Sequence, residues 1–166
     1  MPIVSPILQN PLVDGRQSER AMIVRRGVQR LLSEMGAHVL PELSLATGRR
    51  ADLVALTRQG DIWIIEIKSS IEDFRVDRKW PEYRLHSDRF FFATHPEVPA
   101  EIFPDECGFI LSDGYGAEVM RDAPEHRLAP ASRKALMLRI ARAGAARLTA
   151  AEMAGVSIPA LDGESE

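Results

Sequence analysis

The stretch DIWIIEIKSS, residues 61–70, is the most strand-like part of the chain, and it carries two charged side chains near its end. Four of its residues are isoleucine and one is tryptophan, which is typical of a buried strand. Side chains two residues apart in a strand share a face, so Glu66 and Lys68 lie on the same side as Ile64. Charged groups on an apolar strand are costly unless they are paired or bind something. The stretch therefore predicts a central strand with a candidate site at its end.

Other segments have the apolar periodicity of helices and strands. Strands are predicted over residues 38–45, 51–57, 62–68, 89–94, 107–112 and 117–122, and helices over 17–35, 71–79 and 131–147. Ser70 with Asp73 resembles a capping box, and Pro81 is expected to end or kink the helix that begins at 71. The order helix, three strands, helix, strand, hairpin, helix predicts an α/β or α+β protein with one central sheet covered by helices.

The 166 residues suffice for one domain, which we place at 16–150 between an extended arm at 1–15 and a flexible tail at 151–166. No apolar run is long enough to cross a bilayer. The lone Cys107 excludes an intramolecular disulfide and a cysteine-rich zinc site, and it fits a cytoplasmic protein. A net charge of −3 argues against strong non-specific binding of nucleic acid, although basic patches allow modest, salt-sensitive binding.

Two carboxylates stand at strand ends on either side of the turn RQGD. Asp52 lies seven residues before Gln59 and Glu66 seven after it, so a hairpin would place them side by side. A hard cation such as Mg²⁺ or Mn²⁺ would remove their repulsion, because Mg²⁺ binds one or two carboxylates together with waters and phosphate. The ammonium of Lys68 would hold a phosphate or a water, and the carbonyl of Ile67 would be a third oxygen ligand. This pattern predicts metal-assisted phosphodiester hydrolysis.

Purely structural roles remain open for the same residues. Glu66 and Lys68 would also fit a local ion pair at a strand end, and Asp52 would fit an ordinary turn residue.

The spacing Asp52, thirteen residues, Glu66-Ile67-Lys68 resembles the signature of the PD-(D/E)XK nucleases, with Ala51 where proline often stands. Over a longer stretch, from about Arg26 to Leu148, the chain is similar to the MmcB family of bacterial DNA repair proteins. The segments that carry this resemblance are GRRADLVAL, IWIIEIKSS, DFRVDRKWPEYRLHSDRFFFAT and ASRKALMLRIARAGAARL.

The resemblance implies a restriction-endonuclease-like α/β core, with a central mixed sheet of about five to six strands flanked by helices. It also implies a role in DNA repair or damage tolerance, with Asp52, Glu66 and Lys68 as the metal site. A further acidic residue often joins such sites. Glu42, in the strand next to Asp52, is preferred over Glu19, which lies opposite the apolar stripe of its helix.

Several residues near this pattern are candidates for contacts with DNA. Arg49 and Arg50 directly precede Asp52, and the resemblance places Lys79 and Tyr83 on the second helix, beside the site. Arg26, in the basic segment RAMIVRRGVQR, is a further candidate. Trp80 could also contact DNA, but we assign it to the core. The basic residues of the last helix could contact DNA as well, although a solvated face is favoured for them (Arg133, Lys134, Arg139, Arg142 and Arg147).

The leading hypothesis is a metal-dependent DNA nuclease of the endonuclease type, with DNA and repair or translesion proteins as partners and no membrane. One alternative is a catalytically inactive nuclease-fold module that binds DNA or acts as a scaffold in a repair complex. Another is a protein-interaction role that uses the apolar N-terminal arm and the Ala-rich last helix. The oligomeric state stays open.

Overall fold

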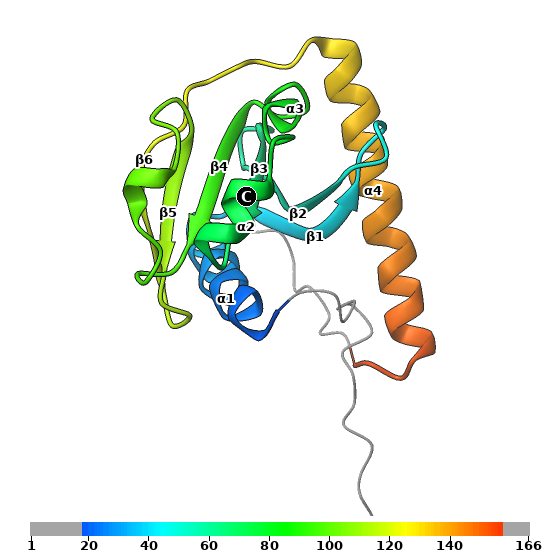
Figure 1. Ribbon diagram of the computed structural model, residues 1–166. Helices are drawn as coiled ribbons and strands as arrows, with labels where there is room; N and C mark the ends of the chain where they lie inside the picture. Colours follow the sequence, from blue (N-terminus) through cyan, green and yellow to red (C-terminus); the bar gives the residue numbers. More distant parts are fainter. Residues whose placement is uncertain (1–17, 158–166) are drawn as a thin grey trace, which may run out of the picture.

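Six strands form one mixed sheet whose spatial order, β1-β2-β3-β4-β5-β6, is also their order in the chain (Figure 1). The computed structural model describes residues 18–157, so the predicted arm at 1–15 and residues 158–166 of the predicted tail lie outside it. The elements are α1 (Glu19–Glu34), β1 (His38–Ser44), β2 (Arg50–Leu56), β3 (Ile62–Ile67), α2 (Ile71–Val76), α3 (Pro81–Arg84), β4 (Arg89–Thr94), η1 (Ala100–Ile102), β5 (Gly108–Ser112), β6 (Ala117–Arg121) and α4 (Pro130–Met153). The predicted α/β class and mixed sheet of five to six strands are confirmed.

Strand direction follows from the connections. β1, β2 and β3 form an antiparallel meander, β4 runs parallel to β3 and β5 parallel to β4, and β6 returns antiparallel to β5. Parallel strands in the middle of a sheet are covered on both faces, which explains the near-continuous apolar runs of β3 and β4. The hairpin turns before β2 and β3 contain Gly48 and Gly60, both at positive φ, where glycine is favoured.

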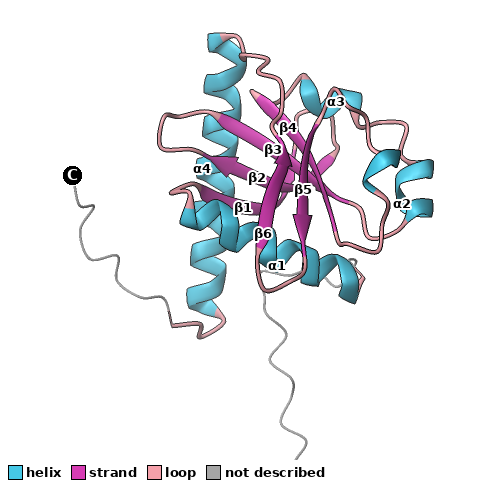
Figure 2. Cartoon of the chain, turned by 90° about the vertical axis from the view of Figure 1, so that its left-hand side faces the viewer, coloured by secondary structure: helices cyan, strands magenta, loops and turns pink. Residues whose placement is uncertain are grey.

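Helices lie against both faces of the sheet (Figures 1 and 2), and each face has its own apolar core. Helix α1 covers one face with Val24, Val28 and Leu32, all fully buried. Its start at Ser18, whose hydroxyl accepts a hydrogen bond from the N–H of Ala21, agrees with the prediction to within two residues. Helices α2, α3 and α4 cover the other face, where the core combines aliphatic side chains with a cluster of aromatic rings. No helix among residues 18–157 is long and apolar enough to cross a membrane.

The helix predicted over 71–79 is α2, which ends at Val76, and a separate short helix, α3, begins at Pro81. Half of the predicted capping box is formed, since Ser70 Oγ accepts from the N–H of Asp73 at 3.1 Å. The return bond goes to the residue before the cap, where Asp73 Oδ2 accepts from the N–H of Ser69 at 3.1 Å. The helix ends at Val76 because Asp77 adopts an extended backbone and its side chain accepts from the N–H of Lys79. Such local bonds compete with helix formation.

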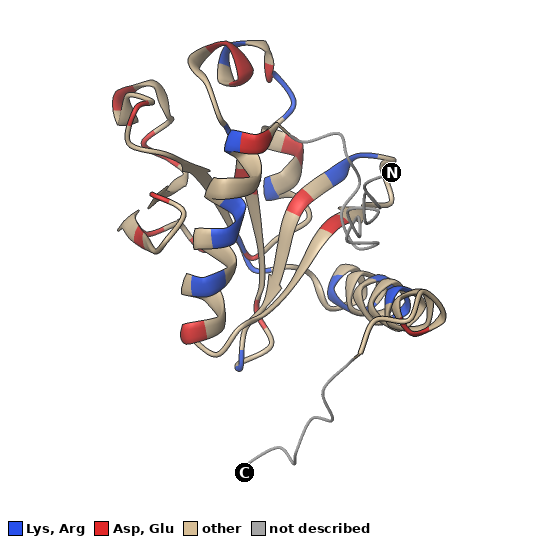
Figure 3. Ribbon diagram, turned by 90° about the horizontal axis from the view of Figure 1, so that it is seen from below, with Lys and Arg blue, Asp and Glu red and all other residues tan. Residues whose placement is uncertain are grey.

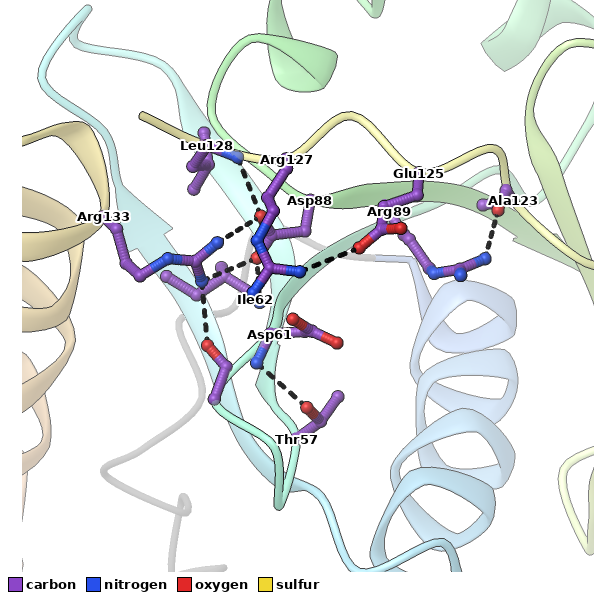
Figure 4. Close-up of polar contacts among 11 residues, drawn as sticks. Thr57, Asp61, Ile62, Asp88, Arg89, Ala123, Glu125, Arg127, Leu128 and Arg133 are labelled. Atoms are coloured by element: carbon purple, nitrogen blue, oxygen red, sulfur yellow. Dashed lines mark hydrogen bonds and ion pairs between the residues drawn. The ribbon is translucent and has the colours of Figure 1, made fainter. Parts of the chain in front are cut away.

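Helix α4 is anchored at its start by Asp88, the residue just before β4 (Figure 4). Asp88 is fully buried, and it accepts hydrogen bonds from the backbone N–H groups of Ile62 and Leu128 and from both terminal nitrogens of Arg133. The helix then continues to Met153, past the domain boundary predicted at 150, because no residue ends it before Gly155 at φ +80°.

Candidate functional site

Asp52 and Glu66 are neighbours at the ends of β2 and β3. Glu66 Oε1 accepts a hydrogen bond from the N–H of Asp52 at 3.0 Å, and Asp52 Oδ2 accepts one from the N–H of Ile67 at 2.8 Å. The ladder that pairs Leu53 with Ile65 leads directly to this pair. Counting from the turn therefore placed the two residues correctly side by side, while their roles stay predictions.

The two carboxylates line an open pocket of about 560 Å³. Three parts of the chain form its walls: the start of α1, the ends of β2 and β3, and the cap and first turns of α2. The lining residues are Ser18, Ala21, Asp52, Glu66, Ile67, Lys68, Ser69, Ser70, Glu72, Asp73 and Val76. Four of the sequence-predicted site residues thus meet in one pocket, namely Asp52, Glu66, Ile67 and Lys68.

Glu66 is an acid in an unfavourable place for a negative charge. Glu66 is only 5% exposed, and burial raises the pKa of its carboxyl group well above the usual range. The negative charge of Asp52 raises this pKa further, and the hydrogen bond from Asp52 and the charge of Lys68 only partly offset the increase. A bound cation would favour the ionised form of both carboxyl groups.

The donor set fits a magnesium-like ion that keeps part of its water shell. Mg²⁺ is held in proteins by one or two carboxylates, with waters and phosphate oxygens as the other ligands. Asp52 and Glu66 provide these two carboxylates. No group of three or more His, Cys, Asp or Glu side chains arranged as metal ligands occurs within residues 18–157, so the part of the chain that is described contains no all-protein cage.

Lys68 has a partner that the sequence did not reveal. Its Nζ lies 2.7 Å from Oδ2 of Asp77, and the two side chains are only 9% and 12% exposed. Burial lowers the pKa of Lys68, but the hydrogen bond and charge of Asp77 outweigh this effect, so its net pKa is raised and the ammonium stays charged. The one available signal was that Asp77 is the acidic residue in the basic run RVDRK.

Glu42, the preferred third acid, lies on β1 at the position opposite Asp52 on β2. The pairs on either side, Pro41 with Leu53 and Leu43 with Ala51, are formed, whereas Glu42 has φ +54° and is left out of the ladder. Its side chain is 8% exposed, with Oε1 at 3.9 Å from Arg50 Nη2. The structure therefore places Glu42 beside a guanidinium, and Glu42 is not among the residues that line the Asp52 pocket. The alternative, Glu19, is exposed in the first turn of α1 and does not line the pocket.

A buried arginine near these acids was missed. Arg25 of α1 is 4% exposed, and its Nε has no hydrogen-bond partner among the described residues. Burial lowers its pKa, while the charges of Glu42 and Asp52 raise it, which shows that the three groups lie within electrostatic reach of one another. An arginine inside an amphipathic helix gives no sequence signal that distinguishes a buried position from an exposed one.

The predicted DNA contacts are spread over several surfaces. Arg49 pairs with Glu82, with Nη2 donating to Oε1 at 3.0 Å. Arg50 contacts Glu42 as described above. Lys79 is exposed, but it lies between α2 and α3 and not on a helix. Arg26 is exposed on α1 and lines a different pocket, near the turn between β5 and β6.

Tyr83 belongs to the core, which corrects its assignment as a candidate DNA contact. It is 7% exposed, its ring stacks on Phe90 with a centroid separation of 5.9 Å, and its hydroxyl donates to the carbonyl of Arg50 at 3.2 Å. Trp80 also stacks on Phe90, at 6.1 Å, in agreement with the core assignment made from the sequence. Aromatic rings packed in this way are not free to stack on bases.

Comparisons with known proteins point to one family. A family model described as "DNA repair protein MmcB-like" matches residues 8–155. The solved structure of a protein of unknown function from Silicibacter pomeroyi is 39% identical, with a TM-score of 0.79, and the match covers 88% of this chain and 99% of that chain. No curated protein matches. The matched range includes every residue of the Asp52–Glu66 pocket.

Proposed function

The chain belongs to the MmcB-like family of DNA repair proteins, and on this premise we propose that it is a divalent-metal-dependent nuclease that hydrolyses phosphodiester bonds in DNA during repair. The observation that carries the proposal is the convergence of two adjacent carboxylates, Asp52 and Glu66, with the ammonium of Lys68 in one open pocket. Two carboxylates can hold a hard metal ion next to a phosphate, and a nearby ammonium can offset the charge of that phosphate.

Each residue has a separate task in this proposal. Asp52 and Glu66 hold Mg²⁺ or Mn²⁺, with the carbonyl of Ile67 as a further oxygen donor. When bound, the ion supplies a Lewis acid that polarises the phosphate and lowers the pKa of a bound water. Lys68 offsets negative charge on the scissile phosphate or orients the attacking water, and its ion pair with Asp77 fixes its position beforehand.

Cleavage assays with matched variants test the proposal. We expect wild-type protein with Mg²⁺ or Mn²⁺ to cut DNA, tried as single-stranded, duplex and branched forms. The variants Asp52→Asn, Glu66→Gln and Lys68→Gln should each lose at least about a hundredfold in rate. Glu118→Gln, which changes an exposed acid on β6, is the control and should keep the wild-type rate. Wild-type activity no greater than that of Lys68→Gln on every DNA form contradicts the proposal.

A second candidate, a non-catalytic DNA-binding module of a repair complex, is favoured by one observation. The Lys68 ammonium is already bound to Asp77, so its charge is partly neutralised within the protein. This candidate predicts salt-dependent DNA binding that persists in EDTA and in Glu66→Gln, without cleavage. Loss of DNA binding on chelation would count against it.

A further inference from the structure

Helix α4 has an unusual charge balance for a chain with a net charge of −3. Its 24 residues include five basic side chains and one acidic side chain, Glu152. Arg133 is committed to Asp88 at the start of the helix, which leaves four basic side chains along the rest of it. Figure 3 shows Lys and Arg at several turns of α4, in contrast to the mixed charges elsewhere.

Three of these arginines line a groove between α4 and β1. The groove has a volume of about 610 Å³, and it is lined on the β1 side by Leu43 and Ser44 and on the α4 side by Arg139, Arg142 and Arg147. The other lining residues are alanine and leucine, so no carboxylate from residues 18–157 lines the groove. We call it the α4 groove.

The hydrogen bonds of these arginines leave their charge uncompensated. Arg139 Nη1 donates to the carbonyl of Ser44 at 3.2 Å, and Arg147 donates to the carbonyls of Pro41 and Glu42, to the latter at 2.7 Å. A carbonyl oxygen orients a guanidinium without cancelling its charge, and each guanidinium has five N–H donors. Within residues 18–157, Arg142 is exposed and has no hydrogen-bond acceptor. Arg139 and Arg147 are thus held in place with donors to spare, and the donors of Arg142 are all available.

The α4 groove has the right length and place to serve the Asp52 pocket. Arg139 and Arg147 are eight residues apart, about 12 Å along a helix, over which one strand of B-DNA carries three to four phosphates. Arg147 binds the carbonyl of Glu42, the residue that lies across the β1–β2 ladder from Asp52. The β1 wall of the groove is therefore the strand next to the proposed metal site.

We propose that the α4 groove binds the phosphate backbone of DNA and holds the strand that the Asp52 pocket acts on. This inference rests on the proposed action on DNA, and it adds the surface that secures the substrate. The occupant is polyanionic, because three guanidinium groups without a carboxylate repel one another until phosphates lie between them. Backbone contacts of this kind are independent of base sequence, so the groove should not discriminate between sequences.

Binding of labelled duplex and single-stranded DNA, measured by fluorescence anisotropy in EDTA over a range of salt concentrations, tests this inference. The variant Arg139→Gln/Arg142→Gln is compared with Arg58→Gln/Arg127→Gln, which removes the same charge from exposed arginines outside both pockets. We expect the α4 variant to bind roughly tenfold more weakly, with a slope of log Kd against log salt reduced by about 1.8, or 0.9 for each lost phosphate contact. Arg142→Gln alone, which breaks no hydrogen bond, should give about half of each change.

The outcomes separate this inference from the nuclease proposal. Binding by the α4 variant that equals binding by the control variant overturns the inference, as does a wild-type protein that binds neither DNA form at low salt. If the α4 variant binds weakly while Lys68→Gln cleaves like wild type, the α4 groove stands and the assignment of the catalytic site fails. If Lys68→Gln is inactive while the α4 variant binds and cleaves like its control, the catalytic site stands and the groove assignment fails.

Discussion

Lys68 and Asp77 form a largely buried ion pair that joins the end of β3 to the break between α2 and α3, with Nζ 2.7 Å from Oδ2. The pair explains why the chain leaves the helix at Val76, since Asp77 must turn toward the sheet to reach Lys68. It also fixes the ammonium at the edge of the Asp52–Glu66 pocket, which Lys68 lines. The α2–α3 break is therefore a structural part of the candidate site.

Removing Asp77 should destabilise the protein more than removing an exposed acid from the same region. Asp77→Ala leaves a buried ammonium without its partner, and we expect the free energy of unfolding to fall by roughly 3 kcal/mol. Glu72→Ala, at an exposed position in α2, is the control and should change it by less than about 0.5 kcal/mol. Urea denaturation measures both values, and equal losses in the two variants would show that the ion pair adds no net stability.

Asp88 should behave as the anchor of α4. Arg133→Gln leaves a fully buried carboxylate with only its two backbone hydrogen bonds, so we expect a loss of roughly 3 kcal/mol in the free energy of unfolding. Lys134→Gln, an exposed change at the next position, should stay within about 0.5 kcal/mol of wild type. Thermal and urea denaturation measure both variants. A loss confined to Lys134→Gln would contradict the anchoring role.

The contribution of Asp88 should depend on pH in a defined direction. Burial raises the pKa of Asp88, but the hydrogen bonds from Arg133, Ile62 and Leu128 outweigh burial and lower the pKa below its ordinary value of 3.8. A lowered acid pKa stabilises the fold above 3.8, and this stabilisation is lost as the pH falls through the folded-state pKa. The stability difference between wild type and Asp88→Asn should therefore be constant from about pH 5 to 8 and should shrink below about pH 4. A difference that grows toward acid pH would contradict this sign.

The contrast between Glu66 and Asp77 shows what the sequence could and could not predict. Asp52 and Glu66 meet through a hairpin, whose register follows from counting residues on either side of the turn. Lys68 and Asp77 meet across a helix break, for which the sequence offered only the weak signal of an acidic residue in the basic run RVDRK. The φ of +54° at Glu42 was likewise not predictable, because it is a local irregularity at a residue that is not glycine, between two formed pairs of the β1–β2 ladder. Periodic segments were therefore predictable, whereas contacts formed at irregular points were not.

Tyr83 should contribute to stability and not to DNA affinity. Tyr83→Phe keeps the ring stacked on Phe90 and removes only the hydrogen bond from the hydroxyl to the carbonyl of Arg50, so we expect a loss of about 1 kcal/mol in the free energy of unfolding. DNA affinity measured by anisotropy should equal that of wild type. A clear loss of DNA affinity without a loss of stability would restore Tyr83 as a DNA contact.

Glu66 should be a source of instability in the metal-free protein. Because burial and the charge of Asp52 raise its pKa above the ordinary value of 4.5, folding disfavours its ionised form. Glu66→Gln keeps an oxygen that accepts from the N–H of Asp52, so we expect this variant to be more stable than wild type at pH 8 in EDTA. The difference in stability should appear as the pH rises above about 4.5 and vanish below it.

Mg²⁺ or Mn²⁺ should raise the melting temperature of wild type and of the control Glu118→Gln, but not that of Glu66→Gln. A Glu66→Gln variant that is less stable than wild type at pH 8 would show that burial of the ionised carboxylate does not destabilise the fold. A variant whose melting temperature rises as much with the metal as that of wild type would show that the carboxylate is not a ligand.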